Sequence, residues 1–286
     1  TKKDLKLSNK KEFNKFNHLI NYLKKLSDTP IGIQISHAGR KGSSEVPWIK
    51  SNKSLKNKDA WTTYAPSEIK KDKNWAIPVE MSKKKINLVK SQFLNTTKLI
   101  KKTKIECLEI HMAHGYLLHQ FFSKISNHRK DKYGGTLENR CRFPLEISEK
   151  IRKEWPTNRI LGARITGSDY IYGGNTLKEA IYLTKELEKI GFDYVCVSAG
   201  GIKTKTKIKF KKGYNLNLAK KIKKKTNILV STTGQLDDLI FADNALKKKQ
   251  INLITIARKF LNDNKFIFKN KLFSKELLPP QYKRGF

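Results

Sequence analysis

Residues 160–198, ILGARITGSDYIYGGNTLKEAIYLTKELEKIGFDYVCVS, contain two apolar runs separated by a longer amphipathic stretch. The runs at 160–166 and 193–198 are short and nearly continuously apolar, which is typical of strands buried on both faces of a parallel sheet. Between them, residues 176–190 place apolar side chains at helical spacing. Two parallel strands joined through a helix form a βαβ unit, so this stretch predicts an α/β fold.

The same alternation runs along the rest of the chain. Further strands are expected at 31–36, 105–110, 227–231 and 252–257, and further helices at 82–103, 137–154, 215–225, 236–248 and 264–273. In the second half these units recur about every 25 to 35 residues, as in a (β/α)8 TIM barrel. Six of the eight strands are found, and an amphipathic helix at 10–26 precedes the first of them. We therefore expect a single barrel domain over 1–286 that lacks its first two βα units.

One segment interrupts this alternation. Residues 37–81 separate the strand at 31–36 from the helix at 82–103 and are rich in Pro, Trp and Ser. The segment is too long for an ordinary βα loop. We expect it to form a lid or a wall of the substrate site.

The formal net charge of +36 raises the question of nucleic-acid binding, because a basic face is what phosphate binding requires. Here the lysines are dispersed over nearly every predicted helix, arginine is scarce, and Asn and Ile are abundant beside the lysines. This pattern indicates a compositional bias and a solvated lysine surface. A nucleic-acid partner is not favoured.

Cysteine usage and hydropathy bear on the compartment. Cys107, Cys141 and Cys196 are too few and too scattered for a disulfide framework or a zinc cluster. No stretch is long and apolar enough for a membrane span, and the first residues contain no signal-peptide core. We expect a reduced, cytoplasmic protein.

Polar and glycine residues follow the predicted strands. In barrels of this type the active site lies at the carboxyl ends of the strands. The residues expected to share one mouth there are Gln34, His37, His111, His114, Tyr116, Arg164, Gly234 and Arg258.

His111 and His114 are the centre of this expected site. They are not at metal-ligand spacing with a third His, Asp or Glu, although Glu109 lies on the same face of the strand as His111. Two neutral N–H donors directed at one carbonyl oxygen fit better, because such a pair stabilises the enolate that forms when hydride adds to a conjugated carbonyl compound. Tyr116, protonated at neutral pH, is a candidate proton donor. The alternatives are that the histidines satisfy buried backbone carbonyls and that the tyrosine is a packing residue.

A second group of residues indicates a flavin. Arg164 is a charge inside an apolar run and needs an anionic partner, which the pyrimidine ring of a reduced flavin would provide. Gln34 can both donate to and accept from a pyrimidine edge. Gly234 and the pair Ala257 and Arg258 follow the last two strands, where such barrels often bind phosphate. Together these residues favour flavin mononucleotide (FMN), and no G-x-G-x-x-G motif indicates a Rossmann unit.

A family resemblance rests on four quoted segments. Residues 111–143, HMAHGYLLHQFFSKISNHRKDKYGGTLENRCRF, resemble the signature of the Old Yellow Enzyme family of FMN-dependent ene-reductases, with its H-x-A-H-G-Y, S-N-x-R-x-D-x-Y-G-G and E-N-R-x-R-F elements. IGIQISHAGRK (31–41), WTTYAPSEI (61–69) and QYKRGF (281–286) resemble the thermophilic-like subgroup. The resemblance covers essentially the whole chain.

The resemblance implies an eight-stranded barrel in which NADPH or NADH reduces FMN, and the flavin passes hydride to the β-carbon of an enone or enal, as in NADPH dehydrogenases. It also implies that His111 and His114 bind the substrate oxygen and that Tyr116 protonates the α-carbon. Gln34 and Arg164 would contact the isoalloxazine, with Ala257 and Arg258 near its phosphate.

Further implications concern assembly. By the same resemblance the protein is a homodimer or homotetramer, and Arg284 reaches the neighbour's substrate pocket. Ala257 stands where the family usually has glycine, which would crowd the phosphate. The two alternatives to an ene-reductase are a tRNA-dihydrouridine synthase-like flavin enzyme and a non-catalytic truncated remnant.

Overall fold

The structure is a computed structural model. It describes residues 1, 4–46, 48, 53–56, 58–269, 276 and 280.

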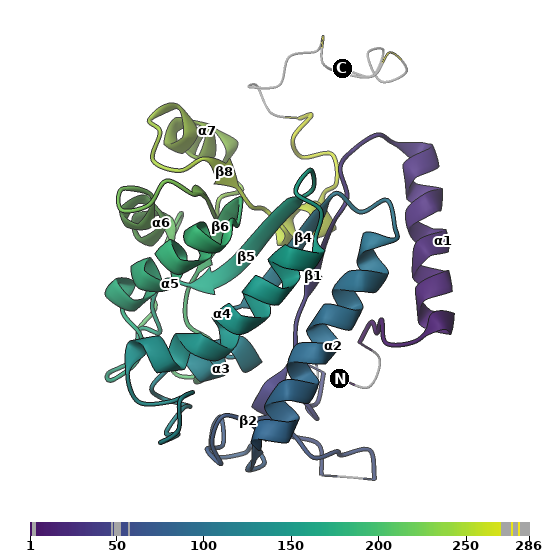
Figure 1. Cartoon of the computed structure of the whole chain (residues 1–286). Helices are drawn as coiled ribbons and strands as arrows, with labels where there is room; N and C mark the ends of the chain where they lie inside the picture. The colour runs from purple at the N-terminus through teal and green to yellow at the C-terminus, as the bar shows by residue number, and fades with distance from the viewer. Residues whose placement is uncertain are drawn as a thin grey trace.

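A six-stranded parallel sheet forms the centre of the protein (Figure 1). Its strands follow one another in the order β1-β4-β5-β6-β7-β8, so each strand pairs with the next strand of the sheet along the chain. Their bounds are Gly32–Ile35 (β1), Cys107–Met112 (β4), Ile160–Thr166 (β5), Tyr194–Ser198 (β6), Leu229–Thr232 (β7) and Leu253–Ile254 (β8). This is the strand order of a (β/α) barrel opened between its first and last strand, as predicted from the apolar runs.

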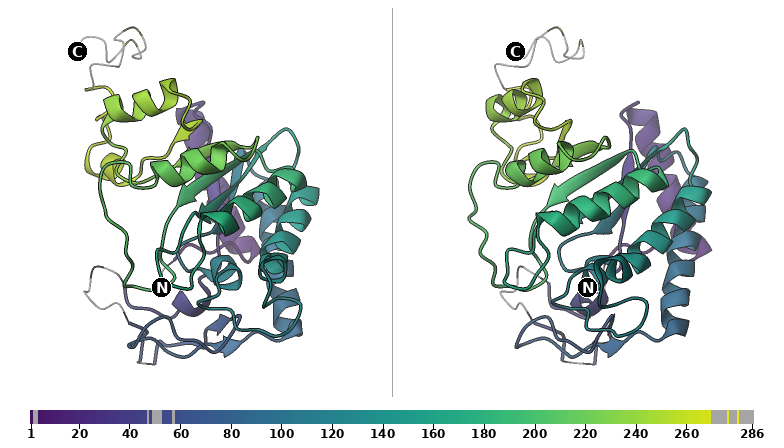
Figure 2. Two further views of the ribbon diagram at one scale, coloured as in Figure 1. Left: turned by 90° about the vertical axis from the view of Figure 1, so that its left-hand side faces the viewer. Right: turned by 60° about the vertical axis from the view of Figure 1, so that its left-hand side comes forward.

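Helices cover one face of this sheet. The helices α2, α4 and α5 lie side by side along it in Figure 1 and in the two further views of Figure 2. The helix bounds are Lys10–Leu26 (α1), Lys83–Lys101 (α2), Leu117–Phe122 (α3), Leu137–Glu154 (α4), Leu177–Ile190 (α5), Leu216–Lys223 (α6), Leu239–Lys247 (α7) and Arg258–Asn262 (α8), with a 3-10 turn at Gly39–Lys41 (η1). The predicted helix at 264–273 is wrong over 264–269, which form turns; residues 270–273 lie outside the described part.

Local sequence signals explain where α5 begins and ends. Thr176 and Glu179 form a capping box at its start, which satisfies backbone N–H groups that have no helical partner. At its end Gly191 takes a left-handed conformation with φ of 93°, which glycine adopts without steric cost.

The two faces of the sheet differ in chemistry because successive strand side chains alternate. On β4, Leu108, Ile110 and Met112 are buried in the hydrophobic core that the helices complete. The intervening residues Glu109 and His111 therefore lie on the opposite face, which is the interior in a closed barrel. This inner face is polar, unlike the core.

A glycine allows two inner-face side chains to fit. A Cβ atom added to Gly162 of β5 would lie 2.1 Å from the ring of Tyr194 on β6. The missing side chain leaves the space that the tyrosine ring occupies.

The long segment 37–81 packs at the end of the sheet where α2 begins, and its described part is drawn in purple and blue in Figure 1. It contains two short paired strands, β2 (Tyr64–Ala65) and β3 (Val79–Glu80). Arg129, in the connection before α4, donates hydrogen bonds to the carbonyls of Pro66 and Met81 and so links this connection to the segment 37–81. Its role as a lid stays a prediction.

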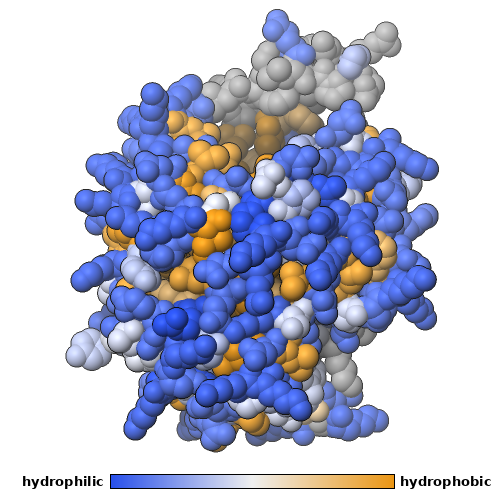
Figure 3. All heavy atoms as spheres, in the orientation of Figure 1, coloured by the Kyte–Doolittle hydropathy of each residue, from blue (hydrophilic) through white to orange (hydrophobic). Residues whose placement is uncertain are grey.

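The outer surface is hydrophilic over most of the face shown in Figure 3, in keeping with the dispersed lysines. Among the described residues, no helix combines the length and the apolar character needed to cross a membrane.

Candidate functional site

The inner face brings together three of the predicted site residues. In the parallel register His111 of β4 is the partner of Arg164 of β5, and Gln34 of β1 is the partner of Glu109 of β4. The next strand continues the row, because Arg164 pairs with Cys196 of β6. The polar side chains of neighbouring strands thus form one continuous surface.

The turn after β4 has an unusual backbone. His114 and Gly115 both have positive φ values, 55° and 72°. A Cβ atom at Gly115 would lie 2.3 Å from the carbonyl oxygen of Gly201, and one at Gly201 would lie 2.5 Å from the Cα of His114. Both glycines are needed because the two backbones touch here.

This turn places the two histidines together. Their ring centroids are 5.1 Å apart, and Nδ1 of His114 lies 3.4 Å from Nε2 of His111. The other nitrogen of His114, Nε2, is 2.6 Å from the hydroxyl of Ser198 on β6. Nδ1 of His111 is buried and has no hydrogen-bond partner among the described residues.

Both imidazoles are neutral at physiological pH. Burial, followed by the charge of Arg164, lowers the pKa of His111 to about 3 and that of His114 to about 2. Removing water penalises the charged form, and a neighbouring cation penalises it further. Each ring therefore carries one proton and can offer one N–H donor.

Tyr116 completes this cluster. Its ring meets that of His111 edge-on, with the centroids 4.9 Å apart. Burial raises the pKa of the Tyr116 phenol, so it stays protonated well above neutral pH.

Lys41 is a site residue that the sequence analysis missed. Its Nζ donates to the carbonyl of His114 at 2.8 Å and lies 4.8 Å from the centre of the Tyr116 ring. Burial and the nearby Lys71 lower its pKa to about 8. Lys41 belongs to the segment IGIQISHAGRK, which the sequence did single out. Its contact with residues 114–116, however, follows only from the fold.

Arg164 and Gln34 are the two residues predicted to contact the flavin ring, a role that stays a prediction. Nε of Arg164 is buried and, within the part of the chain that the structure describes, has no hydrogen-bond partner, which is costly for a cation unless a ligand supplies one. The Gln34 amide donates to the Glu109 carboxylate, which in turn accepts from the hydroxyl of Tyr194 at 2.9 Å. Because the carboxylate only accepts, it fixes the NH₂ end of Gln34.

A cavity of about 250 Å³ lies beyond the ends of β7 and β8. Three predicted phosphate-site residues, Gly234, Ala257 and Arg258, line it, together with Lys259. Gly234 has a φ of 125°. Two cations at one concavity suit a phosphate.

The His37 ring makes no contact with the two histidine rings or Tyr116 in the described part of the structure, although the His37 carbonyl accepts from the backbone N–H of Leu117. His37 accepts a hydrogen bond on Nδ1 from the backbone of Gly39, and burial and Lys85 lower its pKa to about 4. Arg284 lies outside the described residues. No group of three or more His, Cys, Asp or Glu side chains in the described part is arranged to hold a metal ion.

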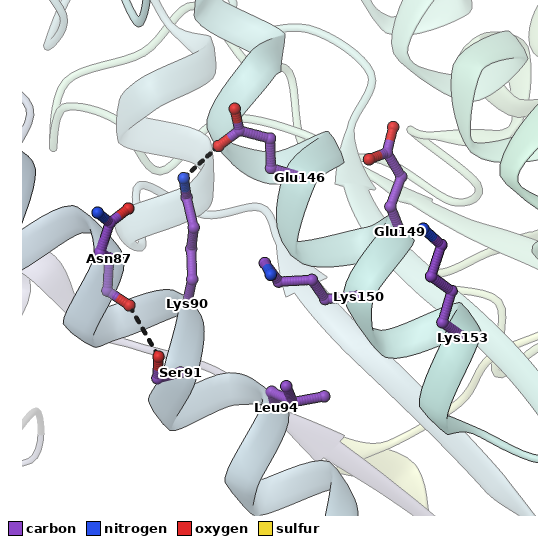
Figure 4. A pocket seen from close by; sticks show the side chains of 8 residues that line it. All are labelled: Asn87, Lys90, Ser91, Leu94, Glu146, Glu149, Lys150 and Lys153. Atoms are coloured by element: carbon purple, nitrogen blue, oxygen red, sulfur yellow. Dashed lines mark hydrogen bonds and ion pairs between the residues drawn. The ribbon is translucent and has the colours of Figure 1, made fainter.

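A larger groove of about 430 Å³ lies elsewhere, between α2 and α4 on the outer surface (Figure 4). It is lined by Lys90, Lys150 and Lys153 together with Glu146 and Glu149. Lys90 is paired with Glu146 across the groove, which ties the two helices together. The groove contains none of the predicted site residues.

Comparison with known proteins identifies the family. The family described as NADH:flavin oxidoreductase / NADH oxidase matches residues 1–273. The chain belongs to this family. The predicted Old Yellow Enzyme membership is thereby confirmed, as is the class of enzyme: a flavin-dependent oxidoreductase with FMN as cofactor and NAD(P)H as hydride donor.

Two NADPH dehydrogenases are among its relatives. That of Bacillus subtilis (strain 168) is 34% identical over 260 residues, which cover 89% of this chain and 71% of the relative. That of Clostridium acetobutylicum is 30% identical over 292 residues, covering 99% of this chain and 80% of the relative. The match to an NADH:flavin oxidoreductase of Gibberella zeae, 37% identical over 248 residues, covers 80% of this chain and 60% of that protein.

Solved structures confirm the fold of this family member. A 2-naphthoyl-CoA reductase complex superposes with a TM-score of 0.79 at 24% identity, covering 92% of this chain and 41% of that one. Morphinone reductase in complex with tetrahydroNAD superposes with a TM-score of 0.72 at 19% identity, covering 96% of this chain and 74% of that one. At such identities the likeness shows the fold alone, and that fold is the α/β barrel predicted from the sequence.

Proposed function

We propose that this protein reduces the activated C=C bond of α,β-unsaturated carbonyl compounds with NAD(P)H. The observation that carries the proposal is the neutral pair His111 and His114, with Tyr116 packed edge-on against His111. Bound FMN, held by Gln34 and Arg164 and by the cavity at Gly234, Ala257 and Arg258, would supply the hydride chemistry.

The histidine pair has the geometry of an oxyanion site. The Ser198 hydroxyl can donate to Nε2 of His114, which leaves the proton of that ring on Nδ1. Nε2 of His111 lies 3.4 Å from that nitrogen, within hydrogen-bond distance. If His111 is protonated on Nε2, both N–H groups are available to one substrate oxygen beside the two rings. An oxygen about 2.8 Å from each nitrogen accepts from both.

These donors act where charge develops. Reduction of a conjugated carbonyl compound leaves negative charge on its oxygen, and preorganised N–H groups stabilise that charge more than they stabilise the neutral carbonyl. The α-carbon then needs a proton, which the phenol of Tyr116 supplies. Lys41, against the Tyr116 ring, helps to hold this side chain in place.

Cysteine positions weigh against an RNA-modifying flavin enzyme. Cys107 and Cys196 lie within β4 and β6, and Cys141 is buried in α4. None lies in a loop at the carboxyl ends of the strands. A tRNA-dihydrouridine synthase-like enzyme would be expected to carry an active-site cysteine in such a loop. A homodimer that shares Arg284, and a cytoplasmic location, stay predictions.

The test uses the FMN-loaded protein without oxygen. NADPH is added to reduce the flavin, and 2-cyclohexenone is then added while flavin absorbance is followed. We expect rapid reoxidation by the enone with formation of cyclohexanone. A flavin that is reduced by NADPH but not reoxidised by the enone would contradict the proposal.

A further inference from the structure

A buried pair of titratable residues lies directly behind the histidine turn and takes no part in the mechanism above. His119 of α3 and Asp169, in the loop after β5, are both fully buried. Nε2 of His119 lies 2.8 Å from Oδ1 of Asp169. The two residues are far apart in sequence and come from different βα units.

Asp169 is held as an anion. Its second oxygen accepts hydrogen bonds from the Ser123 hydroxyl at 2.7 Å and from the backbone N–H of Asn175 at 2.8 Å. Burial alone would raise the pKa of Asp169, but His119 and these hydrogen bonds outweigh it and lower the pKa below its usual value. A buried carboxylate needs such partners to stay ionised.

His119 connects this anion to the active-site turn. Its Nδ1 accepts a hydrogen bond from the backbone N–H of Gly115 at 2.8 Å. An imidazole nitrogen that accepts carries no proton, so the proton of His119 lies on Nε2. That atom is in ion-pair contact with Asp169, without the angles of a hydrogen bond among the described residues. The carboxylate thus selects the tautomer that can receive the Gly115 N–H.

Gly115 is the middle residue of the turn His114–Gly115–Tyr116, and its neighbour His114 has a positive φ that L-residues seldom adopt. We propose that His119 and Asp169 form a positioning pair that fixes this turn and so sets the geometry of the His111, His114 and Tyr116 cluster toward the substrate oxygen. The inference rests on the proposed function, since it assigns the pair to that site.

The decisive variant is Asp169→Asn, which keeps the side-chain size but removes the acceptor-only partner. His119 is then free to carry its proton on Nδ1, where it opposes the Gly115 N–H. In the FMN-loaded protein we expect the dissociation constant of a phenolic ligand, p-hydroxybenzaldehyde, to rise about 10- to 100-fold, the scale on which groups behind a functional imidazole act. The dissociation constant of FMN should change less than about twofold.

Two variants separate positioning from general destabilisation. Ser123→Ala removes one hydrogen bond to Asp169 while keeping its charge, so the His119 tautomer and most of the ligand affinity should be retained. Ser148→Ala removes an equally buried hydroxyl that donates to Pro144 within α4, and it should leave both dissociation constants unchanged.

Nitrogen-15 NMR of the His119 ring tests the inference on the unaltered protein. We expect a bare Nδ1 and a protonated Nε2, with the proton moving in Asp169→Asn and the His111 and His114 ring signals shifting with it. A wild-type proton on Nδ1, or unchanged phenol affinity in folded Asp169→Asn, would overturn the inference. If the wild type binds the phenol but reduces no enone, the proposed function fails, whereas the positioning pair is still decided by the NMR and affinity data.

Discussion

His111 on β4 and Arg164 on β5 are direct partners in the parallel register, with both side chains on the face of the sheet opposite the helices. A permanent cation beside the imidazole adds to burial in keeping that ring neutral. The same guanidinium has a buried Nε without a partner. Under the proposed function, this pairing would keep an N–H donor uncharged for the substrate and would offer a cation to the flavin.

The first prediction concerns the pH dependence of enone reduction. Because the pKa values of His111 and His114 are lowered to about 3 and about 2, neither ring gains a proton as the pH falls from 8 to 5. The raised pKa of Tyr116 keeps the phenol protonated over the same range. The rate of flavin reoxidation by 2-cyclohexenone should be flat between about pH 5 and 7, below the pKa of about 8 of the neighbouring Lys41. An inflection near 6.5 that disappears in His111→Gln would show that a ring titrates normally.

The second prediction concerns stability. The unfolded chain protonates its histidines below a pKa of about 6.5, whereas folded His111 resists protonation down to about 3. The unfolded state therefore binds more protons in this window, and the free energy of unfolding falls as the pH is lowered. From pH 6.5 to 5, His111 contributes a loss of up to about 2 kcal/mol at about 1.4 kcal/mol per pH unit.

Urea unfolding at pH 7 and pH 5 measures this loss. The difference between the two pH values should be smaller in His111→Gln than in the wild type by up to about 2 kcal/mol. An identical difference in both proteins would mean that His111 titrates alike in the folded and unfolded states.

The third prediction concerns FMN affinity. Arg164→Gln removes the unpartnered inner-face cation, and a hydrogen bond to a charged group contributes about 2 kcal/mol, which corresponds to roughly 30-fold weaker binding. Titration of FMN fluorescence measures the dissociation constant. Arg159→Gln is the matched control, because Arg159 donates to the carbonyls of Lys101 and Thr103 away from the inner face. Equal FMN affinity in the two variants would contradict a role for Arg164 in binding the flavin.

The fourth prediction separates the two half-reactions. His111→Ala should raise the barrier of enone reduction by about 2–4 kcal/mol, the cost of losing an oxyanion donor. Tyr116→Phe should slow the same half-reaction because the proton donor is lost. Stopped-flow measurements should find flavin reduction by NADPH much less affected in both variants. Equal losses in the two half-reactions would instead indicate that these side chains only support the fold.

The fifth prediction concerns Arg284, in the thermophilic-like QYKRGF segment. If it acts in the partner's site, mixed dimers of Tyr116→Phe and Arg284→Ala chains contain one intact site and one doubly damaged site. Activity should then rise above that of either parent once subunits exchange. Exchange confirmed by labelled subunits, with no gain in activity, would show that Arg284 does not act in trans.

Much of the scaffold was predictable because its strands are short apolar runs between amphipathic helices. The strand at 160–166 and the helix at 10–26 have the predicted bounds. β4 begins and ends two residues later than the predicted strand at 105–110. Its end was missed because the polar His111 interrupts the apolar run. The predicted strand at 252–257 shrinks to Leu253–Ile254, since only those residues meet the ladder of β7.

The sequence singled out Arg164 and the histidine pair because these residue types are unusual in a buried strand, and the structure places them next to one another. The sequence did not single out four residues whose contacts join segments far apart along the chain: Lys41, Ser198, His119 and Asp169. The residues next to a lysine in a lysine-rich chain, or next to a histidine in a short apolar helix, do not indicate which distant residue it contacts in the fold. The short helices α3 and α8 were missed because they contain too few turns for helical periodicity to be recognised.

The contact between the backbones at Gly115 and Gly201 limits how this protein can diverge. No side chain separates the two segments, so an insertion or deletion in the loop after β6 would displace the turn that carries His114. Length variation among descendants of such a chain should therefore be rare in that loop. It should accumulate instead in the exposed parts of the segment 37–81, where a change of length can alter which substrates enter while the residues that react with them keep their places.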